Sequence, residues 1–375
     1  MSDGEPMRLL YVAAPDTVGG LERVVQALAM GLHRRRHQVA VAAVVNQCTR
    51  SVPFIEPLVE AGVRVEALDL PGRAYVAERR AIRRLCEDFR PDVLHTHGYR
   101  PDVLHAGLAR ALRLPIVTTM HGSSRMGGLS RVHEWLQRLL LWRFDAVVSV
   151  SKPLLGSLEA WVPRGRLHLI PNAGTADPPT LDRTAARRAL GLPDDGPCVA
   201  WVGRLIAAKG PDVFLEAVAR LQIPGLRAVI VGDGRERAAL EARSRTLGLQ
   251  DRVRFLGHRL DVARSFRAFD VFALTSRTEG TPLVLFEAMG AGVPIVATAV
   301  GGVPDVLSEH DALLVPIEDP DRMAQAVATC LTDHGAAQWR ARRARERLHR
   351  EFGTDPWLDR HEALYRRLVT SPSRR

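Results

Sequence analysis

The sequence has few cysteines and few aromatic residues, and it contains no long apolar run. Of its 375 residues only four are cysteine and 5% are aromatic, and the cysteines show no CxxC or Cys/His spacing. This pattern excludes a disulfide framework and a cysteine-based zinc site, and it is typical of a reducing compartment. No run reaches the roughly 20 apolar residues that span a bilayer. The first seven residues lack the basic and apolar regions of a signal peptide, so we expect a cytoplasmic protein.

Lysine is almost absent, because Lys152 and Lys209 are the only two lysines in the sequence. The formal net charge is +10; the basic excess lies in residues 1–180 and 334–375, whereas residues 181–333 are slightly acidic. A basic surface favours an anionic partner such as a membrane, a nucleic acid or a phosphorylated substrate, and the alternative is an arginine-rich genome composition. A nucleic-acid-binding protein is a remote alternative function, since no module interleaves aromatic with basic residues. We therefore expect no nucleic-acid partner.

Short apolar runs alternate with amphipathic segments along most of the chain. The runs predict strands at 8–13, 38–44, 63–68, 92–95, 115–119, 146–150, 198–202, 227–231, 254–256, 271–274, 294–297 and 312–315. Helical patterns fill the gaps, and repeated βαβ units predict parallel sheets covered by helices on both faces. The Pro- and Gly-rich segment 170–179 is typical of a linker. The predicted fold class is therefore α/β, with two tandem Rossmann-like doubly wound domains facing a ligand-binding cleft.

The predicted domains cover residues 1–175 and 176–355. A last helix within residues 356–375 is expected to return to the N-terminal domain. Asp319-Pro320-Asp321 is the only DxD sequence in the chain. It is typical of a helix N-cap followed by proline at the first helical position, so we expect no metal there.

Glu279 and Glu287 lie eight positions apart, where a loop after a strand leads into a helix. Pro282 fits the first position of that helix. A helix N-terminus offers free N–H groups and partial positive charge to a phosphate, and Glu287 can accept hydrogen bonds from two ribose hydroxyls. The alternative is a pair of exposed carboxylates.

Gly203, Arg204 and Lys209 lie between another strand and the following helix. An arginine and a lysine at a strand end can bind a diphosphate. The order Lys-Gly-Pro lacks the Ser or Thr of a P-loop, and Gly232-Asp233-Gly234 does not complete GxGxxG because Arg237 follows. Both departures weaken a nicotinamide or P-loop interpretation. The alternative for Lys209 is a solvated loop lysine.

Polar and glycine residues also follow strands in the first half of the chain. Gly19 and Gly20 allow a close backbone approach to a ligand at a helix start. His121 follows a predicted strand and could form a hydrogen bond with a sugar hydroxyl or a phosphate, which we favour over a structural role. For His95 and His97 the sequence leaves both interpretations open.

These motifs resemble those of the retaining family 4 glycosyltransferases of the GT-B fold, also called glycosyl transferases group 1. The resemblance covers nearly the whole chain, and its core is Gly203-Arg204…Lys209-Gly210, Gly232-Asp233-Gly234 and Glu279-Gly280-Thr281-Pro282…Glu287. It implies a retaining glycosyltransferase that moves a sugar from a nucleotide-diphosphate sugar to an acceptor hydroxyl. No cofactor or metal is expected beyond the donor substrate. Because the family reacts on one face of the sugar, no covalent intermediate on Glu279 is expected.

The resemblance also implies roles for individual residues. Arg204 and Lys209 would bind the donor diphosphate, Glu287 the ribose, and Glu279 and His121 the donor sugar. The catalytic set is then His121, Glu279, Arg204 and Lys209. Backbone and neighbouring residues complete the donor site at Gly19, Gly20, Gly203, Gly280, Thr281, Pro282, Leu283 and Val284.

The acceptor is the least determined part of the prediction. A lipid-linked glycan or another cell-envelope or polysaccharide intermediate is our hypothesis, and a GT-B-fold nucleotide-sugar epimerase is the alternative function. Segment 129–143 predicts an amphipathic helix with Leu129, Val132, Leu136, Leu139 and Leu140 on one face, Arg131, Glu134 and Arg138 on the other, and Trp135 and Trp142 at the flanks. Such a helix could lie peripherally on an anionic membrane, at the inner face of the cell membrane, or it could pack on its own sheet.

Overall fold

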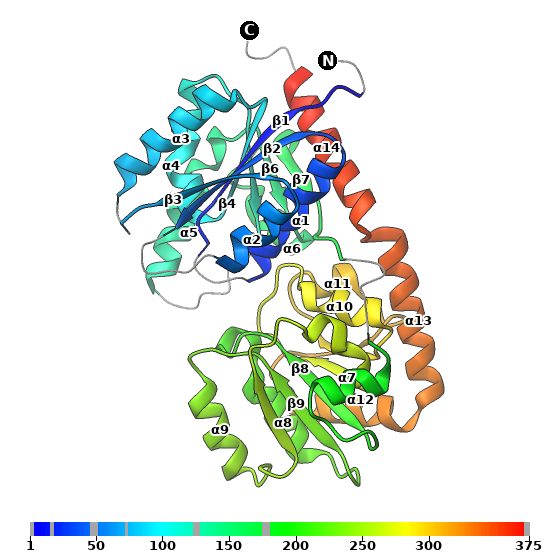
Figure 1. Cartoon of the computed structure of the whole chain (residues 1–375). Helices are drawn as coiled ribbons and strands as arrows, with labels where there is room; N and C mark the ends of the chain where they lie inside the picture. The colour runs from blue at the N-terminus through cyan, green and yellow to red at the C-terminus, as the bar shows by residue number, and fades with distance from the viewer. Residues whose placement is uncertain are drawn as a thin grey trace. The chain divides into compact units, whose positions relative to one another are not determined.

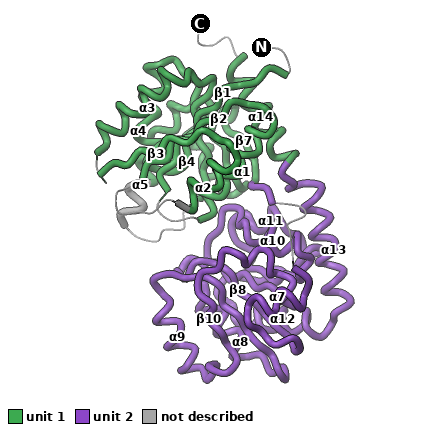
Figure 2. Tube along the Cα trace, in the orientation of Figure 1, with its two compact units in different colours: residues 1–122, 126–171, 355–375 green, residues 123–125, 172–354 purple. Residues whose placement is uncertain are grey.

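The computed structural model describes residues 4–15, 19–45, 52–71, 74–122, 128–174 and 181–370, which form two compact units (Figure 2). The described residues of unit 1 belong to 1–122, 126–171 and 355–375, and those of unit 2 to 172–354. The domain boundary expected at 175/176 lies outside the described residues.

The described part of unit 1 is built on a seven-stranded parallel sheet with the order β3-β2-β1-β4-β5-β6-β7 (Figure 1). Its strands are β1 (Arg8–Ala13), β2 (Gln38–Val45), β3 (Arg64–Asp69), β4 (Val93–His97), β5 (Ile116–Met120), β6 (Ala146–Ser149) and β7 (Leu167–Leu169). Its helices are α1 (Gly20–Arg34), α2 (Val52–Glu60), α3 (Tyr75–Phe89), α4 (Tyr99–Ala111), α5 (Gly128–Leu140), α6 (Lys152–Leu158) and α14 (Thr354–Thr370), with short 3-10 turns η1 (Leu141–Arg143) and η2 (Arg164–Arg166). The short strand β7 was not predicted from the sequence.

The central strands of unit 1 are buried along almost their full length, as a parallel sheet covered on both faces requires. A buried carboxylate connects them to the helices. Asp102 of α4 accepts hydrogen bonds from Thr96 of β4 at 2.5 Å and Thr118 of β5 at 2.9 Å, and from Gln137 of α5 at 2.5 Å. Burial raises the pKa of Asp102 to about 7. This network fixes two strands and two helices of unit 1 at one point.

The C-terminal helix α14 packs against the first helix and strand of unit 1. Leu358 lies so close to Gly31 of α1 that a Cβ at Gly31 would come within 2.7 Å of it. The hydroxyls of Tyr365 and Tyr11 are 3.2 Å apart, and Arg35 donates to Asp359 at 2.6 Å. Apolar packing and surface ion pairs therefore both hold α14 to this unit.

The described part of unit 2 is built on a six-stranded parallel sheet with the order β10-β9-β8-β11-β12-β13. Its strands are β8 (Cys198–Val202), β9 (Arg227–Val231), β10 (Val253–Gly257), β11 (Val271–Leu274), β12 (Ile295–Thr298) and β13 (Leu313–Val315). Its helices are α7 (Arg183–Ala189), α8 (Pro211–Arg220), α9 (Arg237–Thr246), α10 (Leu283–Ala291), α11 (Val303–Val306), α12 (Pro320–Thr332) and α13 (His334–Glu351), with 3-10 turns η3 (Ala207–Lys209) and η4 (Val262–Ala268). The bounds predicted for β8, β9 and β11 are confirmed.

Both sheets reverse their winding direction beside their first strand. In unit 1 this switch point lies between β1 and β4, and in unit 2 between β8 and β11. Ligands of such folds bind outside the carboxyl ends of the strands at the switch point. The predicted doubly wound α/β architecture of the two units is confirmed. A ligand is therefore expected at the loops that follow these four strands.

Helix α5 differs from the amphipathic pattern expected for segment 129–143. Gln137 is buried and faces the protein, while Leu136 and Leu139 of the predicted apolar face are each 37% exposed. The hydrogen bond from Gln137 to Asp102 explains why this polar side chain points inward. The side chains of Leu129, Arg131 and Val132 lie outside the described residues.

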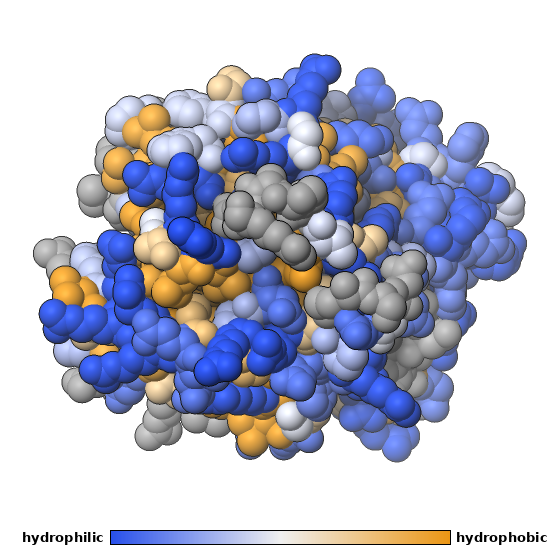
Figure 3. All heavy atoms as spheres, turned by 90° about the horizontal axis from the view of Figure 1, so that it is seen from above, coloured by the Kyte–Doolittle hydropathy of each residue, from blue (hydrophilic) through white to orange (hydrophobic). Residues whose placement is uncertain are grey.

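The surface in Figure 3 is largely hydrophilic, and apolar side chains lie there in small groups. None of the helices in the described ranges has the length and apolar character needed to cross a membrane.

Candidate functional site

Lys209 and Glu279 form an ion pair at the switch point of unit 2. Lys209 ends the turn η3 that follows β8, and Glu279 lies in the loop after β11, the neighbouring strand. The Nζ of Lys209 is 2.7 Å from both carboxylate oxygens of Glu279. Only 5% of the Glu279 side chain and 20% of the Lys209 side chain are exposed. The two charges are therefore fixed where a ligand of this fold would bind.

The Glu279 carboxylate has a second partner on its own loop. The Oγ of Ser276 donates to Oε1 of Glu279 at 2.6 Å. The backbone behind Glu279 is equally constrained, because a Cβ at Gly301, in the loop after β12, would lie 1.9 Å from the Glu279 carbonyl oxygen. Gly301 also has a positive φ of +54°, a conformation that favours glycine. Because Gly301 has no side chain, the loop after β12 can pack directly against the Glu279 backbone.

Backbone contacts join the two charged loops. The N–H of Arg277 donates to the carbonyl of Ala208 at 2.9 Å. Thr275 accepts a hydrogen bond from Trp201 Nε1 at 3.0 Å and donates to the carbonyl of Gly210 at 2.7 Å. Gly210 has φ +62°, and a Cβ there would lie 2.0 Å from the Thr275 carbonyl oxygen. The glycine that follows Lys209 is thus required by the close approach of the two loops.

Arg277 holds the same loops together through its side chain. Its guanidinium donates to Asp212 at 2.9 and 2.7 Å, to the Ala207 carbonyl at 2.6 Å, and to Glu318. The hydrogen bonds to Asp212 and Glu318 raise the pKa of Arg277. Burial opposes ionisation of Asp212, but its bonds to Arg277 outweigh this and lower the pKa of Asp212. Sequence reasoning did not identify this residue, and its place two positions before Glu279 was the only signal.

Arg204 is an exposed side chain directly after Gly203 at the end of β8. Contacts with the end of β9 and with the loop after it fix the backbone on either side of Arg204. The Gly203 N–H donates to the Val231 carbonyl at 3.0 Å, and the Leu205 N–H donates to the Asp233 carbonyl at 2.9 Å. The structure therefore places Arg204 on the same strand end as Lys209, and its role stays a prediction.

Helix α10 carries Glu287 and begins one residue later than expected. The prediction that Pro282 occupies the first helical position is wrong: Pro282 is the N-cap with extended backbone (ψ 116°), and the helix begins at Leu283. Proline has no N–H to donate, so both positions suit it. Glu287 is half-buried one turn into the helix. Its predicted role is not tested by this change.

The backbone segment predicted to complete the donor site leads into α10. Thr281 is buried, and its carbonyl accepts a hydrogen bond from Nδ2 of Asn172 at 3.1 Å. The helix N-terminus provides N–H groups without intrahelical partners, which suits an anion. The other members of the segment are partly exposed or buried around this turn: Gly280, Pro282, Leu283 and Val284.

In unit 1, Gly19 and Gly20 begin α1 after β1. Gly19 is the N-cap, and its N–H donates to the Glu22 carboxylate at 2.9 Å, forming half of a capping box. Gly20 is exposed. The predicted close approach of a ligand to this pair stays a prediction.

His121 is half-buried after β5 and contacts another histidine. Its Nε2 is 3.2 Å from Nδ1 of His97, the last residue of β4. Burial lowers the pKa of His121 to about 4, so the imidazole is neutral at pH 7. His121 can therefore donate or accept one hydrogen bond without carrying charge.

His95 and His97, for which the sequence left two interpretations open, are buried in unit 1. The Nδ1 of His95 is 2.7 Å from the Tyr365 hydroxyl, and its Nε2 is 2.9 Å from the Thr119 hydroxyl. Burial lowers the pKa values of both imidazoles well below the ordinary value. His95 is thus a structural residue with both nitrogens hydrogen-bonded. His97 instead contacts His121 through its Nδ1.

The chain matches known proteins along most of its length. Residues 18–173 match the family model Glycosyltransferase Family 4, and residues 196–333 match Glycosyl transferases group 1. The chain is 32% identical to the D-inositol 3-phosphate glycosyltransferase of Xylanimonas cellulosilytica over 384 residues, which cover 90% of this chain and 89% of the relative. The chain belongs to glycosyltransferase family 4. This confirms the resemblance seen in the sequence motifs.

Solved structures show the same fold as this glycosyltransferase. Anabaena HepE in complex with UDP-glucose has a TM-score of 0.85 at 22% identity, over 96% of this chain and 99% of that chain. Sucrose-phosphate synthase from Thermosynechococcus elongatus has a TM-score of 0.83 at 23% identity, over 96% of this chain and 99% of that chain. The predicted GT-B fold class is therefore confirmed.

Proposed function

We propose that this glycosyltransferase moves a sugar from a nucleotide-diphosphate sugar to an acceptor hydroxyl, with retention of configuration at the anomeric carbon. The observation that carries the proposal is the Lys209–Glu279 pair, which fixes an ammonium and a carboxylate at the switch point of unit 2. A structural neighbour was solved with UDP-glucose, which supports a donor of this class.

The charges at this site suit the breaking of a bond to a diphosphate. As that bond breaks, negative charge develops on the leaving diphosphate, and Lys209, Arg204 and the N-terminus of α10 supply positive charge or N–H donors on unit 2. Glu287, one turn into α10, is proposed to accept hydrogen bonds from the ribose hydroxyls. Preorganised groups of this kind often supply the largest single contribution to catalysis.

Glu279 is proposed to bind sugar hydroxyls rather than to attack the sugar. Its carboxylate already accepts hydrogen bonds from Lys209 and Ser276, which stabilise its negative charge and make it a weaker nucleophile. No covalent sugar–enzyme intermediate is then expected. Mass spectrometry of the enzyme during turnover tests this, because a sugar trapped on Glu279 would contradict it.

Transfer is also proposed to proceed without a metal ion. The carboxylates of the DxD sequence have structural partners: Asp319 caps α12 by accepting from the Arg322 N–H at 2.8 Å, and Asp321 accepts from Arg220 at 2.7 Å. The helix-cap prediction for Asp319 is confirmed. Unchanged transfer in excess chelator is the expected result, and loss of transfer would overturn this part of the proposal.

A thermal-shift screen of UDP-, GDP-, ADP- and dTDP-sugars tests the donor. A bound donor at a hundredfold excess over its dissociation constant stabilises by about 2.7 kcal/mol. One nucleotide class should stabilise the wild type and the control Arg188→Ala, which changes an exposed arginine on α7. The same donor should have little effect on Arg204→Ala and Glu287→Ala. Equal stabilisation of all four proteins would contradict the donor site.

The stereochemical outcome of the transfer can be determined only from the product. Once a donor is known, NMR of the transferred sugar reports whether the anomeric configuration of the donor is kept. Retention supports the proposal, and inversion contradicts it. Change of the donor sugar without any acceptor would instead indicate the epimerase alternative.

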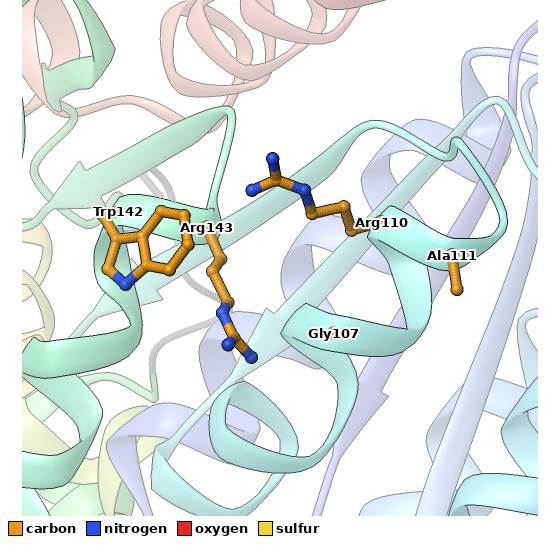
Figure 4. Close-up of a pocket in the computed structure, with 5 residues that line it drawn as sticks. All are labelled: Gly107, Arg110, Ala111, Trp142 and Arg143. Atoms are coloured by element: carbon orange, nitrogen blue, oxygen red, sulfur yellow. The ribbon is translucent and has the colours of Figure 1, made fainter.

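The acceptor is proposed to be a lipid-linked or cell-envelope glycan intermediate, reached by peripheral contact with an anionic membrane. An exposed apolar surface on α5 and η1 of unit 1 supports this: Trp135 is 53% exposed and Trp142 50%. The guanidinium carbons of Arg110 and Arg143 lie 5.5 and 5.2 Å from the Trp142 ring centroid, beside a shallow hollow (Figure 4). Exposed tryptophan next to arginine suits the interface of an anionic bilayer.

Vesicle partition tests the membrane contact. The wild type should bind vesicles that contain anionic lipid and should not bind neutral vesicles. Trp135→Gln with Trp142→Gln should reduce that binding, whereas Trp339→Gln, an exposed tryptophan of α13 in unit 2, should not. Equal partition of all three proteins would contradict the contact.

A further inference from the structure

His97 is a buried imidazole whose position is fixed by the sheet of unit 1. It is only 1% exposed and ends β4, where it pairs in register with Thr119 of β5. His121 lies two residues after Thr119, directly after the end of β5, so the register brings the two rings together. Their centroids are 5.5 Å apart, and Nδ1 of His97 is 3.2 Å from Nε2 of His121.

The hydrogen bond between the two rings can run in only two directions when both are neutral. A neutral imidazole has one N–H and one lone pair. If His121 donated, His97 would carry its hydrogen on Nε2, which is buried and has no hydrogen-bond partner among the described residues. A buried N–H without an acceptor is rare and costly in proteins. The other direction leaves only a lone pair at that nitrogen.

The surroundings keep the His97 ring neutral and in place. Its ring centroid lies 4.2 Å from that of His95, and His95 is itself held at both nitrogens by Tyr365 and Thr119. Burial lowers the pKa values of both His97 and His121, so neither ring is charged at pH 7. The open question at this contact is therefore which nitrogen of each ring carries the hydrogen.

We propose that His97 is a positioning residue that donates its Nδ1–H to Nε2 of His121 and thereby fixes the hydrogen of His121 on Nδ1. His121 then offers an N–H to its ligand, so it binds an oxygen that accepts, such as that of a donor-sugar hydroxyl. It cannot use Nδ1 as a base in this tautomer. The inference rests on the proposed function, because it concerns the ligand that His121 would meet.

Two amide variants of His97 separate the two nitrogens. The side-chain amide of His97→Asn reaches about as far as Nδ1 and can still donate to His121, whereas that of His97→Gln reaches about as far as Nε2 and cannot. Both variants stay polar and are similar in size to histidine. Their thermal unfolding should therefore be alike, which makes each the folding control for the other.

Long-range ¹H–¹⁵N NMR of protein with ¹⁵N-labelled histidine reads the tautomer without any substrate. The His121 signals are identified by their loss in His121→Asn. The hydrogen should lie on Nδ1 of His121 in the wild type and in His97→Asn, and it should shift wholly or partly to Nε2 in His97→Gln. A hydrogen on Nε2 of His121 in the wild type would overturn the inference.

Sugar transfer gives the second readout once a donor is known. The kcat/KM of His97→Asn should stay within about twofold of the wild type, whereas that of His97→Gln should fall roughly threefold to tenfold, as for loss of one hydrogen bond. Equal values in the two variants would contradict a positioning role. If the wild type transfers no sugar, the proposed function fails while the NMR result still decides the tautomer.

Discussion

Units 1 and 2 wind their parallel sheets in the same sense but carry different chemistry at equivalent strand ends. In unit 2 the loops after β8 and β11 carry the charged pair Lys209 and Glu279. In unit 1 Gly19 lies in the loop after β1, the buried His97 ends β4, and His121 follows the next strand, β5. The winding fixes where a ligand can bind, whereas the loop residues decide which ligand chemistry is recognised.

Unit 2 therefore offers fixed charges to a ligand, whereas unit 1 offers neutral hydrogen-bonding groups. In unit 2, Arg277 and Lys209 each form an ion pair with a carboxylate, a chemistry that suits a diphosphate. In unit 1, burial keeps the imidazoles of His97 and His121 neutral, which suits a sugar hydroxyl. Four predictions test this division, from the largest expected effect to the smallest.

Removal of the Lys209 charge should have the largest effect. In Lys209→Met the leaving diphosphate loses a cation, so the rate of sugar transfer should fall about 10²–10³-fold. The variant also leaves Glu279, whose side chain is 5% exposed, with an unpaired charge, which should lower the free energy of unfolding. Steady-state kinetics and thermal unfolding measure the two effects.

A double variant separates the effect on sugar transfer from the effect on stability. Lys209→Met with Glu279→Gln removes both charges, so the thermal stability should recover while transfer stays low. Recovery of transfer in the double variant would show that Lys209 serves only to neutralise Glu279.

Acidification should destabilise unit 1 more than unit 2. Burial lowers the pKa of His121 and His361 to about 4, so between about pH 6.5 and pH 4 the unfolded chain binds protons that the folded unit does not. The free energy of unfolding therefore falls as the pH falls through this window. Asp102, whose pKa is raised to about 7, acts in the opposite direction because the folded unit keeps its proton. Relative to pH 7, the net loss at pH 5 should be at least about 1.4 kcal/mol, because the lowered pKa values of His95 and His97 act in the same direction as those of His121 and His361.

Hydrogen exchange measures the loss of stability on acidification separately for each unit. After correction for the intrinsic exchange rates, the protection of β4 and β5 should decrease between pH 7 and pH 5 more than that of β8 and β11. Equal decreases in the two sheets would contradict the contrast between them.

Loss of the Arg277 bridge should have a smaller, indirect effect. Arg277→Lys cannot reach both carboxylates and the Ala207 carbonyl at once, because lysine has no planar fork of donors. The loops of Lys209 and Glu279 should then be less well positioned, and the KM for the donor should rise roughly tenfold. Exposed Arg188→Lys is the control. A change in kcat alone would argue against a positioning role.

Tyr365→Phe should have the smallest effect. The variant removes the hydroxyl that lies 2.7 Å from His95 and 3.2 Å from the hydroxyl of Tyr11. A lost hydrogen bond costs about 1 kcal/mol, which lowers the unfolding midpoint of a unit of this size by about 2–4 °C. Tyr75→Phe, at an exposed position, should leave the midpoint unchanged. The same shift in both variants would remove the case for this contact.

The sequence predicted the fold and the strand ends well, because alternation of apolar runs and turn residues is a local signal. The bounds of β1, β8, β9 and β11 are as predicted. Lys209 and Glu279 were placed after the correct strands, but their ion pair joins positions 70 residues apart, and no local pattern indicates it.

The parts that could not be predicted depend on contacts between distant segments. The bond between His95 and Tyr365 spans 270 residues, although Trp357, Leu358, His361, Leu364 and Tyr365 already form a helical stripe in the sequence. Gln137 faces inward only because Asp102 is there to accept its hydrogen bond. Pro282 is compatible with either of two adjacent helix positions, so propensity alone could not decide between them.

The measurement that most directly tests the charged loops of unit 2 as the donor diphosphate site is calorimetric titration with UDP, GDP and ADP. The nucleoside diphosphate that binds the wild type should bind Lys209→Met at least about tenfold more weakly, the effect of losing one charge-assisted contact. Its affinity for His121→Asn should stay within about twofold, since His121 is proposed to contact the donor sugar and not the diphosphate. Equal losses in the two variants, or a larger loss in His121→Asn, would contradict the division of chemistry between the two units.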